Sequence, residues 1–372
     1  MEQRCYQSVL FDTTTLPAFQ TALVQDKDGK PKVDNNVPVP QLSPGDILVK
    51  TTMVALNPSD YKMGATFPSP RAVIGNDFVG TVVGIHEKTT TDISIGDIVC
   101  GLVHGSNPAD RSNGAFAQYV RVPADLVLRV PVGFEIEHAA SLGLGLAIAS
   151  VALWEGGLEL EVNPEKPKPT TDTVPLAVLV YGASTATGTI ILQLLRLSGV
   201  QAIATCSQHN FDLVRSYGAS IVFDYADPDT PAKIKKQTDG ELEYAIDTIT
   251  DPDSVGCCYA SISRYGGRYT CLELCPKELL TRRVVSVKFP IAYEIFGKEL
   301  ELSRGYERPA SRESRAAAVR WFKMFQALLD RGKLRAHPVK VLPGRFEGIL
   351  DGLKMLKSGS VSGQKLIVSL AG

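Results

Sequence analysis

One stretch of the chain, residues 174–225, constrains the fold more than any other. It opens with an apolar run at 176–181, turns between Gly182 and Gly188, continues as a helix-like segment at 190–197 and ends in a second apolar run at 200–206. The order strand, tight turn, helix, strand sets a dinucleotide pyrophosphate against a helix N-terminus, where free N–H groups and the helix dipole favour negative charge. This pattern indicates a hydride-transfer enzyme.

Length, composition and charge restrict the class of protein further. The chain has 372 residues, so two domains are expected, and its net charge of −1 argues against a surface that neutralises nucleic-acid phosphates. Seven cysteines, an odd number in a chain of this size, indicate reduced thiols. The N-terminus lacks a signal-peptide pattern, and the longest apolar stretch, 139–154, is shorter than the roughly 18 residues of a membrane span. We therefore expect a soluble, cytoplasmic protein.

The pattern of elements changes along the chain. Up to about residue 140, strand-like runs punctuated by Gly and Pro are typical of a partly closed β-barrel. Residues 164–175 are rich in Pro, Lys and Thr and indicate a linker or loop insertion. Beyond them strands alternate with helices, which predicts a parallel sheet. The early strands are expected at 47–56, 79–85 and 97–103, and the later ones at 176–181, 200–206, 219–223, 243–247, 267–272 and 283–288.

Two later segments complete the expected organisation. Apolar residues with helical spacing predict a helix around 317–329, and the strand-like tail at 365–370 is placed to return to the first domain. The fold class is therefore α/β, a doubly wound Rossmann sheet with a second, β-rich domain. We expect domains at 1–165 and 166–305, with 306–372 returning to the first.

The turn after the first parallel strand departs from the standard dinucleotide fingerprint. Gly182 and Gly188 occupy outer glycine positions, but Thr185 stands where a middle glycine is expected. An ordinary strand-to-helix turn without a ligand is the alternative. The surrounding strand–helix–strand context favours nucleotide binding.

The second strand of this unit ends without Asp or Glu. Ser207, His209 and Asn210 follow it and can donate hydrogen bonds to phosphate oxygens, while Tyr225 is placed to pack at the adenine end. Because a carboxylate here would repel a 2′-phosphate, its absence favours NADPH over NADH. The alternative is that these residues only cap the next helix, a role that suits Asn210.

Lys62 is the candidate catalytic residue. It follows Pro58, which sets the chain direction after a strand, and Ser59 or Asp60, which can cap a helix. An ammonium in a cleft could bind a cofactor ribose or phosphate, or stabilise charge on a substrate carbonyl. The alternative is a solvated surface lysine.

Metal chemistry is not expected. The five histidines include no close pair with helical spacing, and the cysteines form no four-ligand lobe. Of the apolar stretches, 139–154 suits either a cleft floor or a buried helix, and 293–297 is a second candidate wall.

Several short motifs, taken in their order along the chain, resemble those of one family over nearly the whole chain, the medium-chain dehydrogenase/reductases. Within it the chain is most similar to the stand-alone, trans-acting enoyl reductases of fungal polyketide synthases, of the lovastatin enoyl reductase type. The family resemblance rests on 57–60, 75–82, 96–97, 114–119, 182–184 and 218–219, and the subgroup resemblance on 181–187, 194–199, 204–213 and 362–366.

The resemblance implies a GroES-like first domain, an NADPH-binding Rossmann domain and a site in the cleft between them. It implies that the cofactor is lined by Ser59, Asp60, Tyr61, Lys62, Ser184, Thr185, Ala186, Thr187, Ser207, Gln208, His209, Asn210, Tyr225, Leu272, Glu273, Val361 and Ser362. It implies that the substrate is lined by Ala147, Ile148, Ala149, Ser150, Val151, Ala152, Leu153, Trp154, Tyr293, Glu294, Ile295, Phe296 and Gly297.

Two departures from the family pattern affect the chemistry. Gly75-Asn76-Asp77 stands where zinc alcohol dehydrogenases have Gly-His-Glu, which removes a metal ligand. Where some thioester-reducing relatives carry a proton-donating Tyr, the nearest aromatic here is Phe67, which cannot donate. The protonation step therefore has no assured side-chain donor.

The resemblance implies reduction of the α,β-double bond of a polyketide thioester held on an acyl carrier domain. The expected partner is a polyketide synthase, alone or as a hybrid with a nonribosomal peptide synthetase, and the enzyme is expected to be a monomer. Basic residues could meet the acidic carrier, namely Arg282, Arg283, Lys288, Arg304, Arg308, Arg312 and Arg315. The alternatives are a free-standing, zinc-independent quinone or enone reductase and a non-catalytic nucleotide-binding protein.

Overall fold

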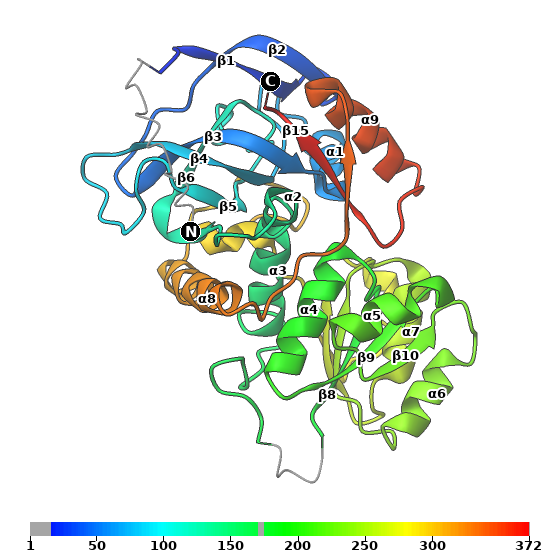
Figure 1. The fold of residues 1–372 in the computed structure, drawn as a ribbon. Coiled ribbons are helices and arrows are strands. Elements are labelled where there is room, and N and C mark those ends of the chain that lie inside the picture. The colour runs from blue at the N-terminus through cyan, green and yellow to red at the C-terminus, as the bar shows by residue number, and fades with distance from the viewer. Residues whose placement is uncertain (1–15, 170–174, 372) are drawn as a thin grey trace.

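The computed structural model describes residues 16–169 and 175–371, which form two lobes joined by central helices (Figure 1). The start of the expected linker, 164–169, lies inside the described residues, whereas 170–174 lies outside them. The first lobe is built mainly from strands and the second from alternating strands and helices.

The first lobe contains a seven-stranded sheet and a two-stranded ribbon. The sheet runs in the order β14-β15-β3-β4-β5-β7, with β6 also paired to β3. Its early strands are β3 (Asp46–Ala55), β4 (Asp77–Ile85), β5 (Ile98–Leu102), β6 (Tyr119–Pro123) and β7 (Val127–Arg129), and the ribbon is β1 (Phe19–Gln25) with β2 (Pro31–Pro38). The strands predicted near 47–56, 79–85 and 97–103 are confirmed.

The last part of the chain completes the first sheet. Strand β15 (Lys365–Ser369) pairs antiparallel with β3, where Val368 lies opposite Val54, and parallel with β14 (Val339–Leu342). Helix α9 (Arg345–Lys357) packs beside β15 and against α1 (Pro58–Thr66). The second sheet therefore lies, in sequence, between strands of the first.

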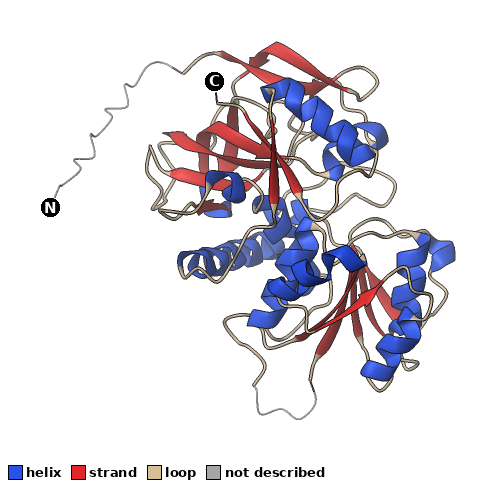
Figure 2. Ribbon diagram, turned by 45° about the vertical axis from the view of Figure 1, so that its right-hand side comes forward, coloured by secondary structure: helices blue, strands red, loops and turns tan. Residues whose placement is uncertain are grey.

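The second lobe is a parallel six-stranded sheet in the order β10-β9-β8-β11-β12-β13. Helices cover both of its faces (Figure 2). All six predicted strands are confirmed, as is the doubly wound fold class, and the strand order reverses between β8 and β11. The elements are β8 (Ala177–Tyr181), α4 (Ala186–Leu197), β9 (Gln201–Cys206), α5 (Phe211–Tyr217), β10 (Ile221–Asp224), α6 (Thr230–Gln237), β11 (Tyr244–Asp247), α7 (Pro252–Ser261), β12 (Gly267–Cys271) and β13 (Val285–Lys288).

One helix lies between the lobes, and a second packs against it and against the first lobe. Helix α3 (Gly143–Leu153) follows the short α2 (Ile136–Ala139), and it contacts both α4 and α8 (Arg312–Asp330). The Trp154 and Trp321 rings stack with centroids 4.4 Å apart. The span 136–153 is long and apolar enough to cross a membrane, but 78% of it is buried inside the protein, which identifies it as a core segment. Short 3-10 turns complete the chain at η1 (Ala124–Leu126), η2 (Gln208–Asn210), η3 (Lys277–Leu279) and η4 (Ala292–Phe296).

Candidate functional site

The turn between β8 and α4 is shaped by small residues and one threonine. Gly182 adopts φ +72°, and a Cβ there would lie 2.4 Å from the Thr248 Oγ1 atom, so a side chain would clash. Thr185 is the N-cap of α4, since its Oγ1 accepts a hydrogen bond from the Gly188 amide at 3.0 Å. The residue that breaks the glycine fingerprint therefore serves as the helix cap.

This turn can receive an anion. Residues 184–187 are partly exposed, and the first N–H groups of α4 have no carbonyl one turn earlier to bond with. The turn lies beside β11, where the strand order reverses and a crevice forms at the carboxyl ends of the strands. A Cβ at Gly188 would lie 2.7 Å from the carbonyl oxygens of both Gly182 and Ala183, so the tight approach of helix to strand requires glycine. The geometry fits a dinucleotide pyrophosphate.

Polar side chains gather at the end of β9. Ser207 Oγ donates to the Tyr225 hydroxyl at 3.2 Å, and His209 Nε2 lies 3.1 Å from Ser362 Oγ. Asn210 Nδ2 also donates to Ser362 Oγ at 3.1 Å, which brings the segment 361–362 next to the nucleotide sheet. Residues far apart in sequence thus meet here in one largely exposed polar group.

A cavity of about 350 Å³ lies between the lobes, next to the α4 turn. Its walls come from α1, the start of α3, the ends of β11 and β12, and the segment 289–306. Seven of the predicted site residues line it, namely Ser59, Lys62, Ile148, Thr187, Leu272, Glu273 and Tyr293. The structure thus brings residues of both lobes to one cavity.

Other predicted residues lie away from this wall. Asp60 is buried behind the start of α1, and Tyr61 does not reach the cavity. Because α3 is buried on nearly all sides, the wall receives Ile148 but not Ala147, Ala149, Ser150, Val151, Ala152, Leu153 or Trp154. Of the 293–297 segment only Tyr293 faces it, while Glu294, Ile295, Phe296 and Gly297 lie elsewhere and Phe296 lines a separate cavity of about 160 Å³.

Several residues that line the cavity were not predicted from the sequence. Thr248 and Ile249 follow β11 at the strand-order reversal, so the strand-end rule would have found them. Tyr306 lies in a loop without a pattern, and no sequence signal pointed to it. The others missed are Asn57, Pro58, Met63, Thr66, Phe67, Leu144, Phe289, Ile291, Ala292 and Leu302.

A cation, a carboxylate and a phenol meet at the cavity wall. Lys62 Nζ lies 3.0 Å from Glu273 Oε2, which joins α1 to the end of β12, and the Tyr306 hydroxyl donates to Glu273 Oε1. The Phe67 and Phe289 rings pack edge-on against the Tyr306 ring, with centroids 5.2 and 5.1 Å away. Burial, and then the Glu273 hydrogen bond, raise the pKa of Tyr306 well above its usual value, so the hydroxyl holds its proton.

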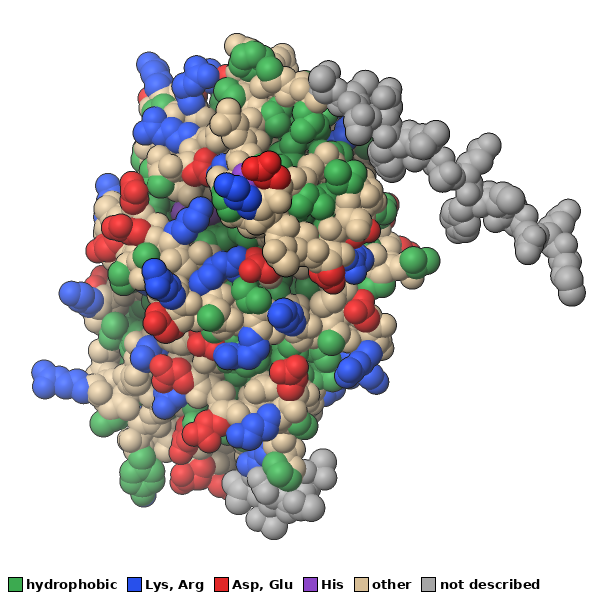
Figure 3. All heavy atoms as spheres, turned by 90° about the vertical axis from the view of Figure 1, so that its left-hand side faces the viewer, with side chains coloured by type: hydrophobic (Ala, Val, Ile, Leu, Met, Phe, Trp, Pro, Cys, Tyr) green, Lys and Arg blue, Asp and Glu red, His purple; other side chains and the backbone are tan. Residues whose placement is uncertain are grey.

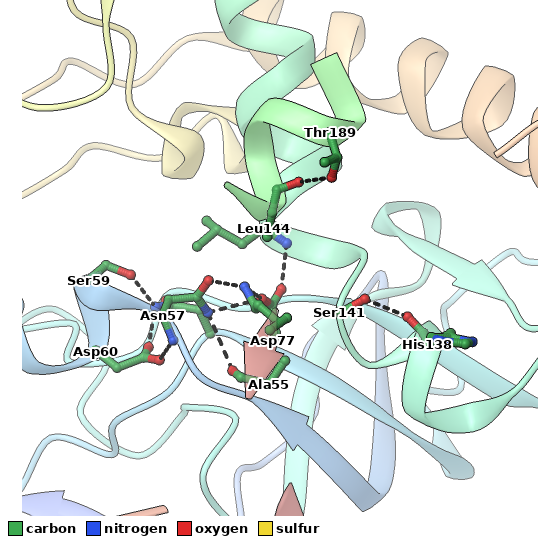
Figure 4. Close-up of polar contacts among 12 residues, drawn as sticks. Ala55, Asn57, Ser59, Asp60, Asp77, His138, Ser141, Leu144 and Thr189 are labelled. Atoms are coloured by element: carbon green, nitrogen blue, oxygen red, sulfur yellow. Dashed lines mark hydrogen bonds and ion pairs between the residues drawn. The ribbon is translucent and has the colours of Figure 1, made fainter. Parts of the chain in front are cut away.

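A buried polar network supports the cavity floor (Figure 4). Asn57 Nδ2 donates to Asp77 Oδ2 at 3.0 Å, and Asp77 Oδ1 accepts from the Leu144 amide at 2.5 Å. Lys365 Nζ, brought in by β15, lies 3.1 Å from Asp77 Oδ2 and also donates to Asn57 Oδ1. One carboxylate therefore ties together β4, α1, α3 and the last strand.

Asn76 extends this network to the other side of α1. Its Nδ2 donates to Asp60 Oδ1 at 2.6 Å and to Ser59 Oγ at 3.2 Å, and its Oδ1 accepts from the Tyr293 hydroxyl at 2.8 Å. Burial raises the pKa of Asp60 to about 7. Among residues 16–169 and 175–371 no group of three or more His, Cys, Asp and Glu is placed to hold a metal ion.

Two family models match the chain. The alcohol dehydrogenase GroES-like domain matches residues 43–132, and the zinc-binding dehydrogenase domain matches residues 186–321. An alcohol dehydrogenase superfamily protein from Novosphingobium aromaticivorans, 19% identical, superposes with a TM-score of 0.73 over 95% of this chain and 100% of that one. The fold is therefore that of the medium-chain dehydrogenase/reductases, with a two-lobed crevice of the kind that holds a nicotinamide cofactor.

Closer relatives define the subgroup. The chain is 45% identical over 362 residues to the trans-enoyl reductase ccsC of Aspergillus clavatus, covering 96% of this chain and 98% of that protein. It is 46% identical over 356 residues to the trans-enoyl reductase RAP2 of Pyricularia oryzae, covering 95% and 99%. The chain belongs to the trans-enoyl reductase family, which confirms the resemblance found in the sequence.

Proposed function

We propose that this oxidoreductase is an NADPH-dependent enoyl reductase that reduces the α,β-double bond of a polyketide thioester carried by a partner synthase. One observation carries the proposal: a crevice suited to a dinucleotide opens onto a half-open, largely apolar cavity, in a chain of the trans-enoyl reductase family. When bound, the nicotinamide would supply the hydride for the β-carbon.

The residues around the crevice suit the phosphorylated cofactor. The α4 turn, residues 184–187, would hold the pyrophosphate, and the group at the end of β9 would hold the 2′-phosphate through Ser207, His209 and Tyr225. Residues 207–210 include no carboxylate to repel that phosphate. Along the rest of the cofactor we place Lys62, Leu272 and Glu273 at the cavity and Ser362 beside His209.

The cavity walls provide orientation and an apolar surface. Leu144, Ile148, Ile249 and Leu272 are apolar, so they displace water from the face of a conjugated thioester that lies against them. Reduction at the β-carbon leaves negative charge on the thioester oxygen, and charge of this kind needs donors already in place. The Lys62 ammonium is the charged donor at this wall, and we assign it the role of positioning the cofactor ribose or the thioester oxygen.

The partner proposed is the acyl carrier domain of a polyketide synthase, alone or as a hybrid with a nonribosomal peptide synthetase, meeting a monomeric enzyme in the cytoplasm. Arg283, Arg304 and Arg312 are exposed and available to an acidic carrier. Other basic candidates are engaged within the protein: Arg282 donates to three carbonyls, while Lys288, Arg308 and Arg315 pair with Glu159, Glu294 and Asp125. On the face seen in Figure 3, acidic and basic side chains are mixed.

Binding and turnover measurements test the proposal. Fluorescence titration is expected to show tighter binding of NADPH than of NADH, and Ser207→Asp should weaken NADPH binding by about tenfold because it adds a charge near the 2′-phosphate. Ser94→Asp, on an exposed loop between β4 and β5 of the first lobe, is the matched control. NADPH oxidation should follow addition of enoyl-pantetheine and of carrier-bound enoyl chains. Turnover of simple quinones with no turnover of enoyl thioesters would refute the substrate assignment, and NADPH binding without any turnover would indicate a non-catalytic protein.

A further inference from the structure

The reaction proposed above needs a proton for the α-carbon, and few groups at the cavity can give one. The aliphatic hydroxyls that line the cavity, those of Ser59, Thr66, Thr187 and Thr248, are far weaker acids than a phenol. The Lys62 ammonium also lines the cavity, but it is paired with Glu273 at 3.0 Å and its side chain is 48% exposed. The acidic hydroxyls that line the cavity are the phenols of Tyr293 and Tyr306. The choice therefore lies between two tyrosines on the same wall.

Tyr293 is poorly connected for this task. It is 5% exposed, its ring stacks on His104 with centroids 3.7 Å apart, and its hydroxyl donates to the amide oxygen of Asn76 at 2.8 Å. A neutral side-chain amide does not relay protons, since its nitrogen holds its hydrogens firmly and its oxygen is a weak base. A proton lost from Tyr293 would have no route of replacement.

Tyr306 is connected to solvent through ionisable groups. Its hydroxyl donates to one oxygen of Glu273, and the other oxygen accepts from Lys62 Nζ at 3.0 Å. The Lys62 side chain is 48% exposed, so its ammonium exchanges protons with water. The phenol, the carboxylate and the ammonium form one chain from the cavity to the surface.

The surroundings hold the phenol in a fixed position. The Phe67 and Phe289 rings pack edge-on against Tyr306 from opposite lobes, one from the loop after α1 and the other after β13. A ring fixed by such packing loses little entropy when its hydroxyl meets a substrate atom. The position is thus built from both lobes, which also line the cavity.

We infer that Tyr306 is the proton donor of the reduction and that Glu273 and Lys62 resupply its proton. This inference rests on the proposed function. In the protonation step the Tyr306 O–H turns from Glu273 to the α-carbon, the electron pair of the thioester enolate forms the new Cα–H bond, the Tyr306 O–H bond breaks, and a phenolate remains. Glu273 then passes a proton from the Lys62 ammonium to the phenolate, and water returns a proton to Lys62. The net cost is one hydride from NADPH and one proton from solvent.

The central experiment compares Tyr306→Phe with the wild-type enzyme on an α-methyl enoyl-pantetheine. Loss of a positioned general acid should lower kcat by about 10²- to 10⁴-fold. Since the ring is kept, KM and the Kd of NADPH should change by no more than about twofold. The configuration of the product at the α-carbon reports the face of protonation, which we expect to be single in the wild type and mixed in Tyr306→Phe. Tyr265→Phe, which alters a ring that is 70% exposed, is the matched control and should behave as the wild type.

A second variant tests the relay without turnover. Glu273→Gln keeps an oxygen for the Tyr306 hydroxyl but removes the negative charge beside it. The phenolate absorbance band, taken as the difference from Tyr306→Phe, should therefore appear at lower pH in Glu273→Gln than in the wild type. An unchanged titration would refute the coupling, whatever the kcat of Tyr306→Phe.

The outcomes separate this inference from the function on which it rests. A wild-type enzyme that reduces no enoyl thioester would refute both. A Tyr306→Phe enzyme with wild-type kcat and a single product configuration would refute Tyr306 as the proton donor but would leave the proposed reductase function standing. Weakened NADPH binding with unchanged kcat would mean that Tyr306 only fastens the lobes together. Loss of activity in Tyr293→Phe but not in Tyr306→Phe would assign the proton to Tyr293, and would also overturn the inference.

Discussion

Replacing Lys365 with methionine should destabilise the protein far more than loss of a surface charge. The Lys365 side chain is 8% exposed and that of Asp77 is fully buried, with Nζ 3.1 Å from Oδ2. Methionine fills similar space but leaves the Asp77 carboxylate in a dry site without its cation. Removing one partner of such a buried pair costs about 3–5 kcal/mol of unfolding free energy. Two hydrogen-bond donors to Asp77 remain, from Asn57 and the Leu144 amide, so the lower end of this range is expected.

Urea unfolding followed by far-UV circular dichroism measures this cost. The double variant Lys365→Met/Asp77→Asn should recover at least about 1.5 kcal/mol relative to Lys365→Met, because no buried charge is left and the Asn57 amide can turn to accept from Asn at position 77. Lys354→Met removes an exposed ion pair with Asp351 and should change stability by no more than about 0.5 kcal/mol. Additive single effects at 365 and 77, to within about 0.5 kcal/mol, would refute the reasoning.

Two further perturbations test other parts of the structure. His104 is buried, and its Nε2 meets no partner among the described residues. Burial lowers the pKa of His104 from 6.5 to about 3. The contribution of the neutral imidazole to the unfolding free energy is therefore present above pH 6.5 and is lost as the pH falls toward 3. Between pH 7 and 5 the wild type should therefore lose about 2 kcal/mol relative to His104→Phe, measured by urea unfolding at both pH values. Gly188→Ala places a Cβ 2.7 Å from two carbonyl oxygens and should weaken NADPH binding at least about tenfold, measured by fluorescence titration.

Each of these predictions has a clear contrary result. Asp60, whose pKa of about 7 gives the opposite pH dependence, is present in both proteins of the His104 comparison and cancels in the difference. If the difference in unfolding free energy between the wild type and His104→Phe stayed constant from pH 7 to 5, His104 would not be held neutral by burial. Gly256→Ala is the control for the turn, since a Cβ there, inside α7, meets nothing within 4 Å. Gly256→Ala should raise the unfolding free energy of the protein by about 0.5–1 kcal/mol. An unchanged NADPH affinity in Gly188→Ala would contradict the proposed role of this turn in cofactor binding.

The sequence predicted the nucleotide sheet closely because its signals are local. Strands β8 (AVLVY) and β9 (QAIATC), in the middle of the sheet, are short and mainly apolar, since both faces of the sheet are covered by helices. The turn at Gly182 was visible because its positive φ and close contacts admit only glycine. Strand β2, with the sequence PKVDNNVP, carries no such signal, because it lies in an exposed two-stranded ribbon.

The candidate site was harder to predict, because it is made where distant segments meet. The apolar stretch 139–154 was expected either to line the cleft or to form a buried helix. In the structure α3 is buried, and its Leu144 and Ile148 side reaches the cavity. An apolar sequence pattern predicts that a helix is buried, but it does not identify the elements that bury it.

By itself, the sequence determined the fold class, the strand–turn–helix unit and the family, because each follows from short-range patterns of apolar residues, glycines and motifs. Only the tertiary structure decided that Tyr306 meets Glu273 and Lys62, and that Lys365 returns to Asp77 from the end of the chain. Tyr306 and Glu273 are 33 residues apart in the sequence, and Lys365 and its partner Asn57 are 308 residues apart. Such contacts arise from the packing of two lobes, and no local pattern of residues encodes them.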